Sequence, residues 1–342
     1  MEFALIGASA FILSVILTPL AIKTAFAFGI VDKPLTKLKK HSNAMPYLGG
    51  AAMYLAFIIT VTASKLIMEG TVKGVYGIVI GASIMTVMGL VDDIKRLNPY
   101  IKLGGQLLVA LLIIKADMHI KFMDSNIINH ILTVLWIVGI TNALNIIDIM
   151  DGLASGVAAV ASVAFFIVAL LAGRVNDMIP AMALFGAVSA FLIYNRPPAK
   201  IYMGDAGSLF LGFVLAAIAL NESYSRVNYI AVLAPILILG VPIFDTFLVM
   251  FLRMRKGLLP IYGSDDHLAQ RLVMIGFSRK QATVFLVLLT AALSAVAITT
   301  TFLTIGASLV IYLIVAFAAL MLAMLVTSVD MKDFHKVYKK RK

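Results

Sequence analysis

The sequence predicts an all-α protein, a polytopic bundle of transmembrane helices, and three observations carry this prediction. Of the 342 residues, 62% are hydrophobic, whereas a soluble domain has about 45–50% apolar residues. The mean hydropathy is +1.03. Apolar stretches long enough to cross a bilayer follow one another nearly from end to end. Because no polar stretch is long enough for a soluble domain, we expect one integral membrane domain over residues 1–342.

Eleven segments can each form a membrane-spanning helix, for which about 20 apolar residues are needed. The first of them is not preceded by Lys or Arg, so it lacks the basic start of a signal peptide and is expected to stay in the protein. Three segments are short or carry polar residues near an end (74–91, 101–115 and 207–220), and a buried or tilted helix is an alternative there. The expected spans are 3–22, 47–67, 74–91, 101–115, 128–146, 153–172, 178–194, 207–220, 228–251, 281–301 and 304–327.

The basic residues predict the orientation of the bundle, because cytoplasmic loops carry an excess of Lys and Arg. If the N-terminus lies outside, the inside segments hold 22 of the 28 Lys and Arg residues and the outside segments hold 6. The C-terminus is then cytoplasmic, and residues 328–342 form a basic tail against anionic headgroups. Since topology accounts for the net charge of +11, we expect no nucleic-acid partner.

Acidic residues gather at the inside ends of the predicted spans, where carboxylates are costly and usually functional. Asp92 and Asp93 directly follow a span and would raise each other's pKa unless a cation lies near them. Asp245 lies within an otherwise apolar span. The structural alternative is that each carboxylate only pairs with a nearby Lys or Arg. Because the acidic residues form five short clusters on one face, such pairing does not explain all of them. The acidic residues on or near this face are Asp32, Asp92, Asp93, Asp148, Asp151, Asp205, Asp245, Asp265, Asp266, Asp330 and Asp333.

A run of polar side chains ends the fifth predicted span. Asn142, Asn145, Asp148 and Asp151 recur at every third residue, so neighbouring pairs are adjacent on a helix surface. Because the set drifts around a straight helix, we expect Asp151 to lie beyond the helix end. Two amides and two carboxylates can recognise a base, a sugar or a metal shell, and an interhelical hydrogen-bond seam is the alternative.

Three more inside residues are candidates for binding. Asn195 precedes a turn with two prolines, and Asp205 lies between glycines at a predicted helix start. Glycine permits close approach of a phosphate and a helix N-terminus favours anions, although a simple N-cap is the alternative for Asp205. The 252–280 segment carries His267 among several basic residues, which favours a phosphate role, but the same charges could serve topology alone.

The available side chains favour a hard divalent cation. The absence of cysteine excludes disulfides, thiolate metal sites and a cysteine nucleophile. Oxygen ligands with few histidines favour Mg²⁺ or Mn²⁺ over zinc, and Mg²⁺ typically takes one or two carboxylates plus substrate phosphates. Phosphoryl transfer needs mainly positioning and charge neutralisation. The residues therefore predict metal-dependent chemistry on a phosphate at the cytoplasmic membrane surface.

The order and spacing of these motifs resemble the polyprenyl-phosphate N-acetylhexosamine-1-phosphate transferase family, over about residues 25–280. This family lies in the glycosyltransferase 4 and phospho-MurNAc-pentapeptide translocase superfamily. The predicted spans and orientation look more like its undecaprenyl-phosphate GlcNAc-1-phosphate transferase branch than like the translocase. The motifs that carry the resemblance are Pro46-Tyr47-Leu48-Gly49-Gly50, Gly89 to Asp93 with Lys102 and Gln106, Asn142 to Gly152, Asn195, Met203 to Ser208, and His267 with Arg271-Leu272 and Gly276-Phe277-Ser278.

The resemblance implies a reaction, a cofactor and a location. N-acetylhexosamine-1-phosphate, foremost GlcNAc-1-phosphate, would pass from a UDP-amino sugar to undecaprenyl phosphate or a similar polyprenyl phosphate. UMP would be released, and a lipid-linked cell-envelope glycan such as lipopolysaccharide or teichoic acid would be started. The resemblance also implies Mg²⁺, with Mn²⁺ as an alternative, and a multi-pass protein of the inner (plasma) membrane with its active site on the cytoplasmic face. A homodimer is compatible with it.

Carried onto this chain residue by residue, the resemblance assigns the metal to Asp205. Asp92 would deprotonate or orient the lipid phosphate, and Asp93 would support the metal or the same phosphate. Lys102 and His267 would contact donor phosphates or sugar. The residues that would hold the nucleoside and pyrophosphate are Asn142, Asn145, Asp148, Asp151, Asn195 and Tyr202, the last two at the uracil.

Three places depart from the family pattern. Ile149 stands where the family usually has glycine, and Ala269 and Gln270 replace two of three histidines. The first inside loop reads Leu38-Lys39-Lys40-His41, with fewer basic residues before the histidine than usual. These departures bear on donor specificity, and none of them touches the predicted catalytic or metal-binding aspartates.

Three alternatives remain open at this point. One is a reaction of the translocase type, and another is a secondary transporter that uses intramembrane aspartates as ion sites. Such transporters usually bind near the bilayer midplane between inverted repeats, whereas here the carboxylates lie at one face and no repeat is evident. The third is an inactive scaffold, which the departures suggest and the retained metal ligands argue against.

Overall fold

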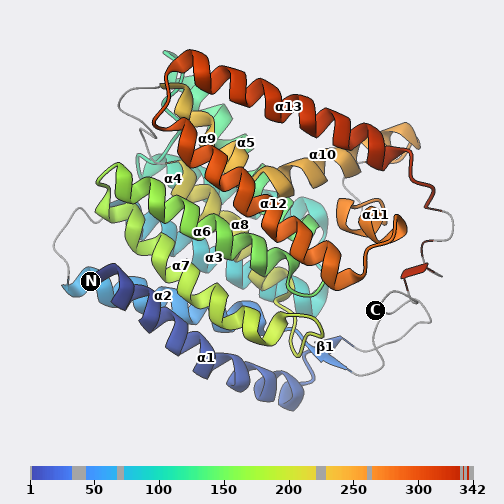
Figure 1. Cartoon of the computed structure of the whole chain (residues 1–342). Coiled ribbons are helices and arrows are strands. Elements are labelled where there is room, and N and C mark those ends of the chain that lie inside the picture. The colour runs from blue at the N-terminus through green and yellow to red at the C-terminus, as the bar shows by residue number, and fades with distance from the viewer. Residues whose placement is uncertain are drawn as a thin grey trace.

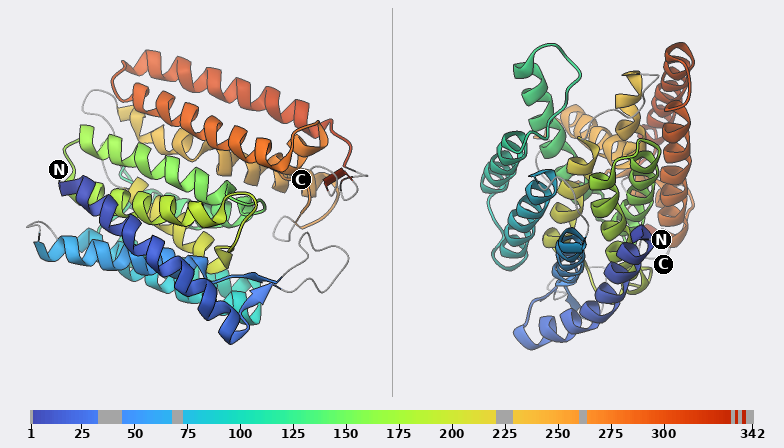
Figure 2. Two further views of the ribbon diagram at one scale, coloured as in Figure 1. Left: turned by 60° about the horizontal axis from the view of Figure 1, so that its bottom comes forward. Right: turned by 90° about the vertical axis from the view of Figure 1, so that its left-hand side faces the viewer.

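The computed structural model describes residues 2–32, 44–67, 73–220, 229–259, 264–331, 334 and 337–338, and nearly all of them are helical. Its elements are α1 (Glu2–Phe28), β1 (Val31–Asp32), β2 (Met45–Pro46), α2 (Gly49–Ile67), α3 (Lys73–Lys95), α4 (Pro99–Lys115), α5 (Asn126–Ile147), α6 (Leu153–Leu171), α7 (Val175–Asn195), α8 (Gly204–Ala219), the 3₁₀ helix η1 (Tyr229–Leu233), α9 (Ala234–Ile238), α10 (Gly240–Arg255), α11 (Leu268–Met274), α12 (Arg279–Thr300) and α13 (Ile305–Thr327). The long helices run side by side, with α1 and α13 at opposite edges (Figure 1, Figure 2).

The predicted helical membrane protein is confirmed, and each predicted span coincides with a helix or a bent pair of helices. In the described part of the chain, seven helices are long and apolar enough to cross a membrane. The segment from Ala231 to Arg255 adds an eighth candidate, broken by a bend of 69° between α9 and α10. The apolar helical parts of α2 and α8 are shorter than the seven long helices. Helix α4 is counted neither with the seven long helices nor with these two shorter ones. The number of crossings and the orientation stay predictions.

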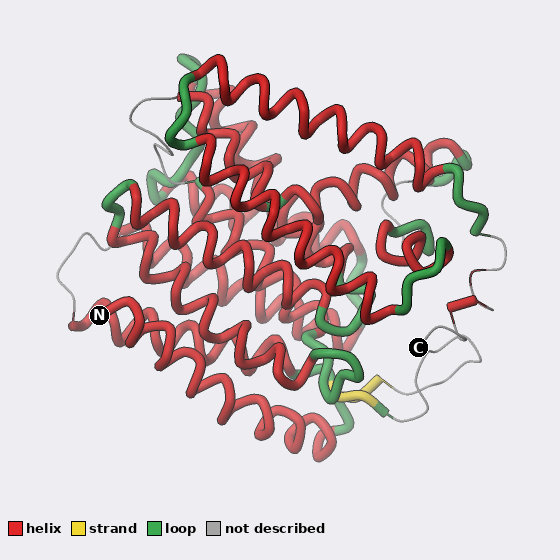
Figure 3. Tube along the Cα trace, in the orientation of Figure 1, coloured by secondary structure: helices red, strands yellow, loops and turns green. Residues whose placement is uncertain are grey.

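Two features were not expected from the sequence. A two-residue antiparallel ladder pairs Val31 with Pro46 and Asp32 with Met45, and it lies at one end of the bundle (Figure 3). The short helix α11 lies in the 252–280 segment, which the sequence predicted only as a polar loop. The sequence departure at 38–41 and the basic residues at 336 and 339–342 lie outside the described residues.

Helix α8 is the centre of the bundle. Every residue from Ala206 to Ala219 is buried, and α2, α3 and α5 pack against the helix. No charged residue occurs from Ala206 to Leu220. A helix that is apolar all round is expected to be buried on all sides, so this sequence matches its position.

Glycines allow α2 and α3 to approach the start of α8 very closely. A Cβ atom at Gly50 would lie 2.1 Å from the backbone nitrogen of Gly207. A Cβ atom at Gly89 would lie 2.4 Å from both Ala206 N and Asp205 O. Because these neighbours are backbone atoms of a buried helix, they cannot move aside as a flexible side chain could.

We expect Gly89→Ala to destabilise the fold, because the added methyl group meets the backbone of α8. Overpacking of a core typically costs about 1–3 kcal/mol. The measurement is the apparent melting temperature in detergent, followed by size-exclusion chromatography after heating.

Gly104→Ala is the matched control. Gly104 also lies inside a helix, but a Cβ atom there would meet nothing within 4 Å. Its melting temperature should stay the same or rise, since alanine favours a helix over glycine by about 1 kcal/mol. Equal melting temperatures for the two variants would contradict the close contact at Gly89.

Candidate active site

A cavity of about 1050 Å³ opens at the end of the bundle that carries β1 and β2. Its described lining includes residues from every segment that the charge distribution predicts to be cytoplasmic, although these segments lie far apart in sequence. The six segments are 23–46, 92–102, 147–152, 195–206, 252–280 and 328–342. Nine of the cavity's 22 described lining residues are charged. Its aspartates are Asp32, Asp92, Asp93, Asp148, Asp151 and Asp205, and its basic residues are Arg96, Arg279 and Lys280.

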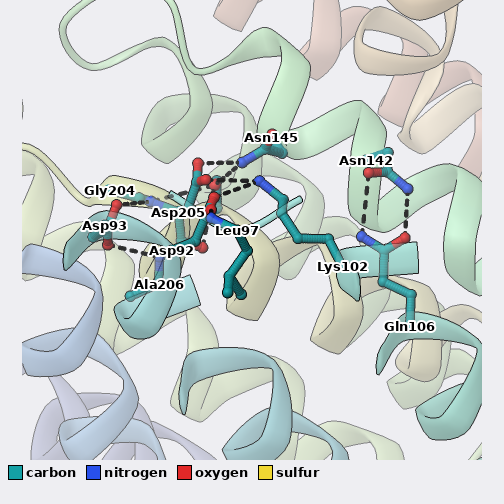
Figure 4. A network of polar contacts seen from close by, with 11 residues as sticks. Asp92, Asp93, Leu97, Lys102, Gln106, Asn142, Asn145, Gly204, Asp205 and Ala206 are labelled. Atoms are coloured by element: carbon teal, nitrogen blue, oxygen red, sulfur yellow. Dashed lines mark hydrogen bonds and ion pairs between the residues drawn. The ribbon is translucent and has the colours of Figure 1, made fainter. Parts of the chain in front are cut away.

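One lysine joins two of these aspartates across three helices. The Lys102 ammonium lies 2.6 Å from Oδ2 of Asp92 and 2.8 Å from Oδ2 of Asp205 (Figure 4). Lys102 is in the first turn of α4, which begins with the cap Asn98 and with Pro99 as its first residue. Proline suits that position because its fixed φ is helical and the missing N–H is not needed there. The tight α3–α4 turn also brings the Leu97 amide to Asp92, which accepts its hydrogen bond.

Asn145 fixes the other oxygen of the Asp205 carboxylate. Its Nδ2 donates to Oδ1 of Asp205 at 2.7 Å and to Oγ of Ser208 at 2.8 Å (Figure 4). Both acceptors lie in the first turns of α8, whereas Asn145 lies near the end of α5. The predicted metal ligand is therefore oriented from two helices at once.

Asp93 points in a different direction from Asp92 and caps α8. Its two carboxylate oxygens accept hydrogen bonds from the amides of Asp205 at 2.8 Å and Ala206 at 3.1 Å. Gly204 is required beside it, because its φ is +67° and a Cβ atom there would lie 2.4 Å from Oδ2 of Asp93. Asp93 thus satisfies buried helix amides and sets the position of Asp205.

The α5–α6 turn brings two further aspartates to the cavity. α5 ends at Ile147, so Asp148 is its C-cap and Asp151 lies beyond the helix, as the spacing predicts. Burial raises the pKa of Asp148 to about 8, and the charges of Asp205, Asp93 and Asp151 add to the effect. At neutral pH this carboxyl group is mainly protonated, so the cavity is less negative than a count of aspartates suggests. Oδ2 of Asp151 accepts a hydrogen bond of 3.0 Å from the Ala199 amide.

Asn195 lines the cavity, but its side chain is largely engaged within the protein. Oδ1 accepts hydrogen bonds from the amide of Gly152 at 3.1 Å and from the hydroxyl of Ser155 at 2.8 Å. Nδ2 donates to the carbonyl of Ile201 at 3.0 Å. These bonds join the end of α7, the start of α6 and the loop before α8, so Asn195 shapes the wall that Tyr202 and Asp151 occupy.

Tyr202 lies in that wall with a second tyrosine. Its ring centroid is 6.3 Å from that of Tyr47, and both rings line the cavity. Burial, with Asp151 next in effect, raises the pKa of Tyr202 to about 12, so its hydroxyl stays protonated. The two rings provide an aromatic surface beside the aspartates.

Three predicted site residues are not among the described residues that line the cavity: Lys102, Asn142 and His267. Lys102 lies behind the carboxylates that it joins. Asn142 exchanges hydrogen bonds of 2.7 and 3.2 Å with Gln106 and donates to the carbonyl of Val138, which is the interhelical seam given as the alternative.

His267 is buried, and its Nδ1 lies 2.8 Å from Oδ2 of Asp245. Asp245 also accepts a hydrogen bond of 2.6 Å from the amide of Leu268, so this buried carboxylate joins α11 to α10. Gln270 accepts a hydrogen bond of 3.2 Å from the amide of His267. The departure at Gln270 therefore supports the start of α11.

The sequence patterns assign no role to several residues that line the cavity, among them Arg96, Arg279, Lys280 and Tyr338. In those patterns the three basic residues indicate only topology. Their position next to predicted spans, on the same side as the aspartates, was the available signal. Tyr338 gave no comparable signal, because a tyrosine in a basic tail has no distinguishing pattern.

The donor set at Asp205 fits a magnesium ion that binds mainly through substrate. In the described part of the chain, no group of three or more His, Asp or Glu side chains is arranged to hold a metal. Mg²⁺ does not need such a cage, since one or two carboxylates with phosphates and water suffice. Asp205 accepts hydrogen bonds from Lys102 and Asn145, and a carboxylate has further lone pairs for a cation.

Comparison with known proteins relates the chain to polyprenyl-phosphate N-acetylglucosaminyl-1-phosphate transferases. The family model described as "Glycosyl transferase family 4" matches residues 75–222. A Bacillus subtilis protein named "Probable undecaprenyl-phosphate N-acetylglucosaminyl 1-phosphate transferase" is 34% identical, covering 95% of this chain and 93% of its own length. A "Decaprenyl-phosphate N-acetylglucosaminephosphotransferase" of Mycolicibacterium smegmatis is 28% identical, covering 84% and 79%. An "Undecaprenyl-phosphate alpha-N-acetylglucosaminyl 1-phosphate transferase" of Escherichia coli is 24% identical, covering 85% and 82%.

The loop before α11 should lose stability in acid. Burial opposes ionisation of Asp266, but hydrogen bonds from Lys256, Ser264 and Arg271 outweigh it and lower the pKa of this carboxyl group. A lowered folded-state pKa contributes stability that is complete above the unfolded value of about 4 and is lost as pH falls through the folded value. We expect Asp266→Asn to be less stable than the unmodified protein at neutral pH.

The difference in melting temperature between Asp266→Asn and the unmodified protein should shrink as pH falls below about 4, because the Asp266 carboxyl group becomes protonated there. Melting temperatures measured in detergent over a pH series check this. A difference that is constant with pH would show that the charge of Asp266 does not stabilise the loop.

Proposed function

Because this chain belongs to glycosyl transferase family 4, we propose that it transfers GlcNAc-1-phosphate from UDP-GlcNAc to undecaprenyl phosphate or a similar polyprenyl phosphate. The relatives reported above carry this activity in their names, over most of their own length. The observation that carries the proposal for this chain is the network of Asp92, Lys102, Asp205 and Asn145 at the cavity. UMP is the second product, and the product lipid starts a cell-envelope glycan.

The reaction takes place on the cytoplasmic face of the plasma membrane. Support comes from the cavity itself, whose lining is drawn from the six segments that hold most of the Lys and Arg residues. Such an excess is typical of the cytoplasmic side. A lipid phosphate and a water-soluble nucleotide sugar would both reach a cavity that opens at this end of the bundle.

The chemical step is an in-line displacement at phosphorus. An oxygen of the acceptor phosphate attacks the phosphorus that is bonded to the sugar, and the bond from this phosphorus to the bridging oxygen breaks. UMP leaves with that oxygen. Since the attacking oxygen is already anionic, the protein has mainly to position the two phosphates and to neutralise their charge.

The chain's own residues divide this work. Asp205 would hold Mg²⁺, and a bound ion would neutralise charge on the donor pyrophosphate. Asp92 orients the acceptor phosphate, and Lys102 neutralises the adjoining carboxylates of Asp92 and Asp205. Asn145 and Asp93 hold the carboxylate and the backbone of Asp205, respectively.

The nucleoside end of the donor belongs beside Tyr202. Its ring and that of Tyr47 offer a surface for stacking of uracil. Asp148 and Asp151 supply polar groups to the ribose and pyrophosphate, the protonated Asp148 as a hydrogen-bond donor. Asn195 contributes by holding this wall in place.

No observation favours the alternative functions. A transporter would need its carboxylates along a path through the membrane, and here the aspartates of the cavity gather at one end of the bundle. A scaffold without activity would not need Asp205 to be oriented by Asn145 and Lys102.

Asp205→Asn should abolish transfer, because it removes the charge that binds the cation while keeping the hydrogen bond from Lys102. Purified protein with UDP-GlcNAc, undecaprenyl phosphate and Mg²⁺ should release UMP, and chelation should stop the release. We expect a loss of about 10²-fold or more in the variant, as for other groups that act on transition-state charge.

Asp117→Asn is the control for this substitution. Asp117 has an exposed side chain and lies just after α4, at the end remote from Lys102. It should release UMP at the rate of the unmodified protein. Full activity of Asp205→Asn would refute the assignment of the site.

Asn145→Ala and Asn142→Ala should separate the two asparagines that the sequence pattern groups together. Asn145→Ala frees the carboxylate of Asp205 and should lower the rate of UMP release about 10-fold or more. Asn142→Ala leaves Gln106 unpaired between α4 and α5, so it should lower the melting temperature and leave the rate of the folded fraction largely unchanged. The reverse pattern would contradict the geometry of both residues.

A further inference from the structure

The catalytic cavity holds an excess of carboxylates over cations, although both proposed substrates are phosphates. Among its described lining residues are six aspartates and only three basic residues. Two of the three, Arg279 and Lys280, begin α12. The position of this helix start therefore decides where an anionic ligand can be bound.

Arg279 is held against the C-terminal part of the chain. Its guanidinium carbon lies 3.8 Å from the centroid of the Tyr338 ring, and Nη2 donates a hydrogen bond of 2.7 Å to the carbonyl of Tyr338. Its Nε is buried and has no hydrogen-bond partner in the described part of the chain. A guanidinium offers several N–H donors in a rigid plane, so Arg279 retains donors for a ligand in the cavity that it lines.

Tyr338 is itself firmly packed. It lines the cavity with only 4% of its surface exposed, and its ring is 4.9 Å from that of the buried Phe334. The end of α13 and the residues directly after it are held as well, because Nη1 of Arg271 donates to the carbonyls of Val326 and Val329. Tyr338 is therefore a fixed platform for the guanidinium.

The start of α12 is also joined to the turn that carries the nucleotide-side aspartates. The hydroxyl of Thr283, one turn into the helix, donates to the carbonyl of Asp151 at 3.4 Å. Asp151, Tyr202 and Arg279 also line the same cavity. Arg279 is thus placed beside the wall proposed for the nucleoside.

We propose that Arg279 binds the diphosphate of the nucleotide donor, and that Tyr338 is the positioning residue that holds its guanidinium in place. The ligand class is a nucleoside diphosphate, and the inference rests on the proposed function for the identity of that nucleotide. Arginine suits this task because its planar donors pair with phosphate oxygens and its face stacks on an aromatic ring.

The kinetic test compares the KM for UDP-GlcNAc with kcat for UMP release. Loss of a hydrogen bond to a charged group should raise KM about 10-fold or more in Arg279→Ala. Arg279→Lys should recover part of this loss because the charge remains.

Tyr338→Ala should raise KM several-fold, whereas Tyr338→Phe should behave like the unmodified protein because ring and carbonyl are kept. The effects of Arg279→Ala and Tyr338→Ala should be less than additive, since both act through one contact.

Direct binding separates this inference from the proposed function. UMP and uridine are titrated into the purified protein. Arg279→Ala should weaken the binding of UMP far more than the binding of the uncharged uridine. Arg255→Ala is the control, because Arg255 also contacts an aromatic ring, that of Phe251, but is exposed and does not line the cavity. Its KM should not change.

An unmodified protein that neither releases UMP nor binds it would overturn the proposed function and this inference with it. If the unmodified protein is active, a KM within about twofold in Arg279→Ala overturns the inference alone. Equal effects of Tyr338→Phe and Tyr338→Ala would overturn the positioning role, because the ring would then not matter. Size-exclusion profiles and melting temperatures of every variant show that the protein is folded in each comparison.

Discussion

The site depends on one hydrogen-bonding requirement. α8 is buried on every side, so the free amides of its first turn cannot be left to water. Asp93 satisfies two of them from the neighbouring helix, and this contact fixes the approach of α3 to α8. The close packing at Gly89 and the left-handed backbone at Gly204 follow from that approach. Once the backbone of Asp205 is held in this way, its side chain is directed toward Lys102 and Asn145.

Charge is the second constraint, because carboxylates this close to one another repel at the edge of a membrane. The structure reduces the repulsion in two ways that are visible before any substrate binds. Lys102 joins Asp92 and Asp205, and Asp148 holds its proton at neutral pH. The remaining negative charge makes the cavity receptive to a cation, and three basic residues line the same cavity. Such a combination suits a ligand that brings phosphates and a divalent ion together.

Hydrophobic length predicted the helical fold, because it is a local property of the sequence. Charge and polar spacing predicted only that Asp92, Asp205 and Asn145 lie on the same side of the membrane, and the family resemblance grouped them into one site. These patterns could not distinguish Asn142 from Asn145, since a period of three residues drifts around the helix and only packing decides which amide reaches the cavity. Asp93 likewise shares its motif with Asp92 but faces the amides of α8. The sequence could not predict that Tyr338 lies at the cavity, because its position depends on how the chain packs after α13.

The distribution of the cavity wall along the chain has a consequence for biogenesis. Its lining begins at Asp32 and ends at Tyr338, so no early fragment of the polypeptide contains the whole wall. During synthesis the segments that carry the cavity aspartates are made before Arg279 and Tyr338. A chain arrested or wrongly threaded by the insertion machinery would thus carry the aspartates of the first spans without the residues that complete the pocket. If the cavity binds the proposed nucleotide, the complete binding site is present only in molecules whose helices have all been integrated, and nucleotide affinity would then report correct insertion.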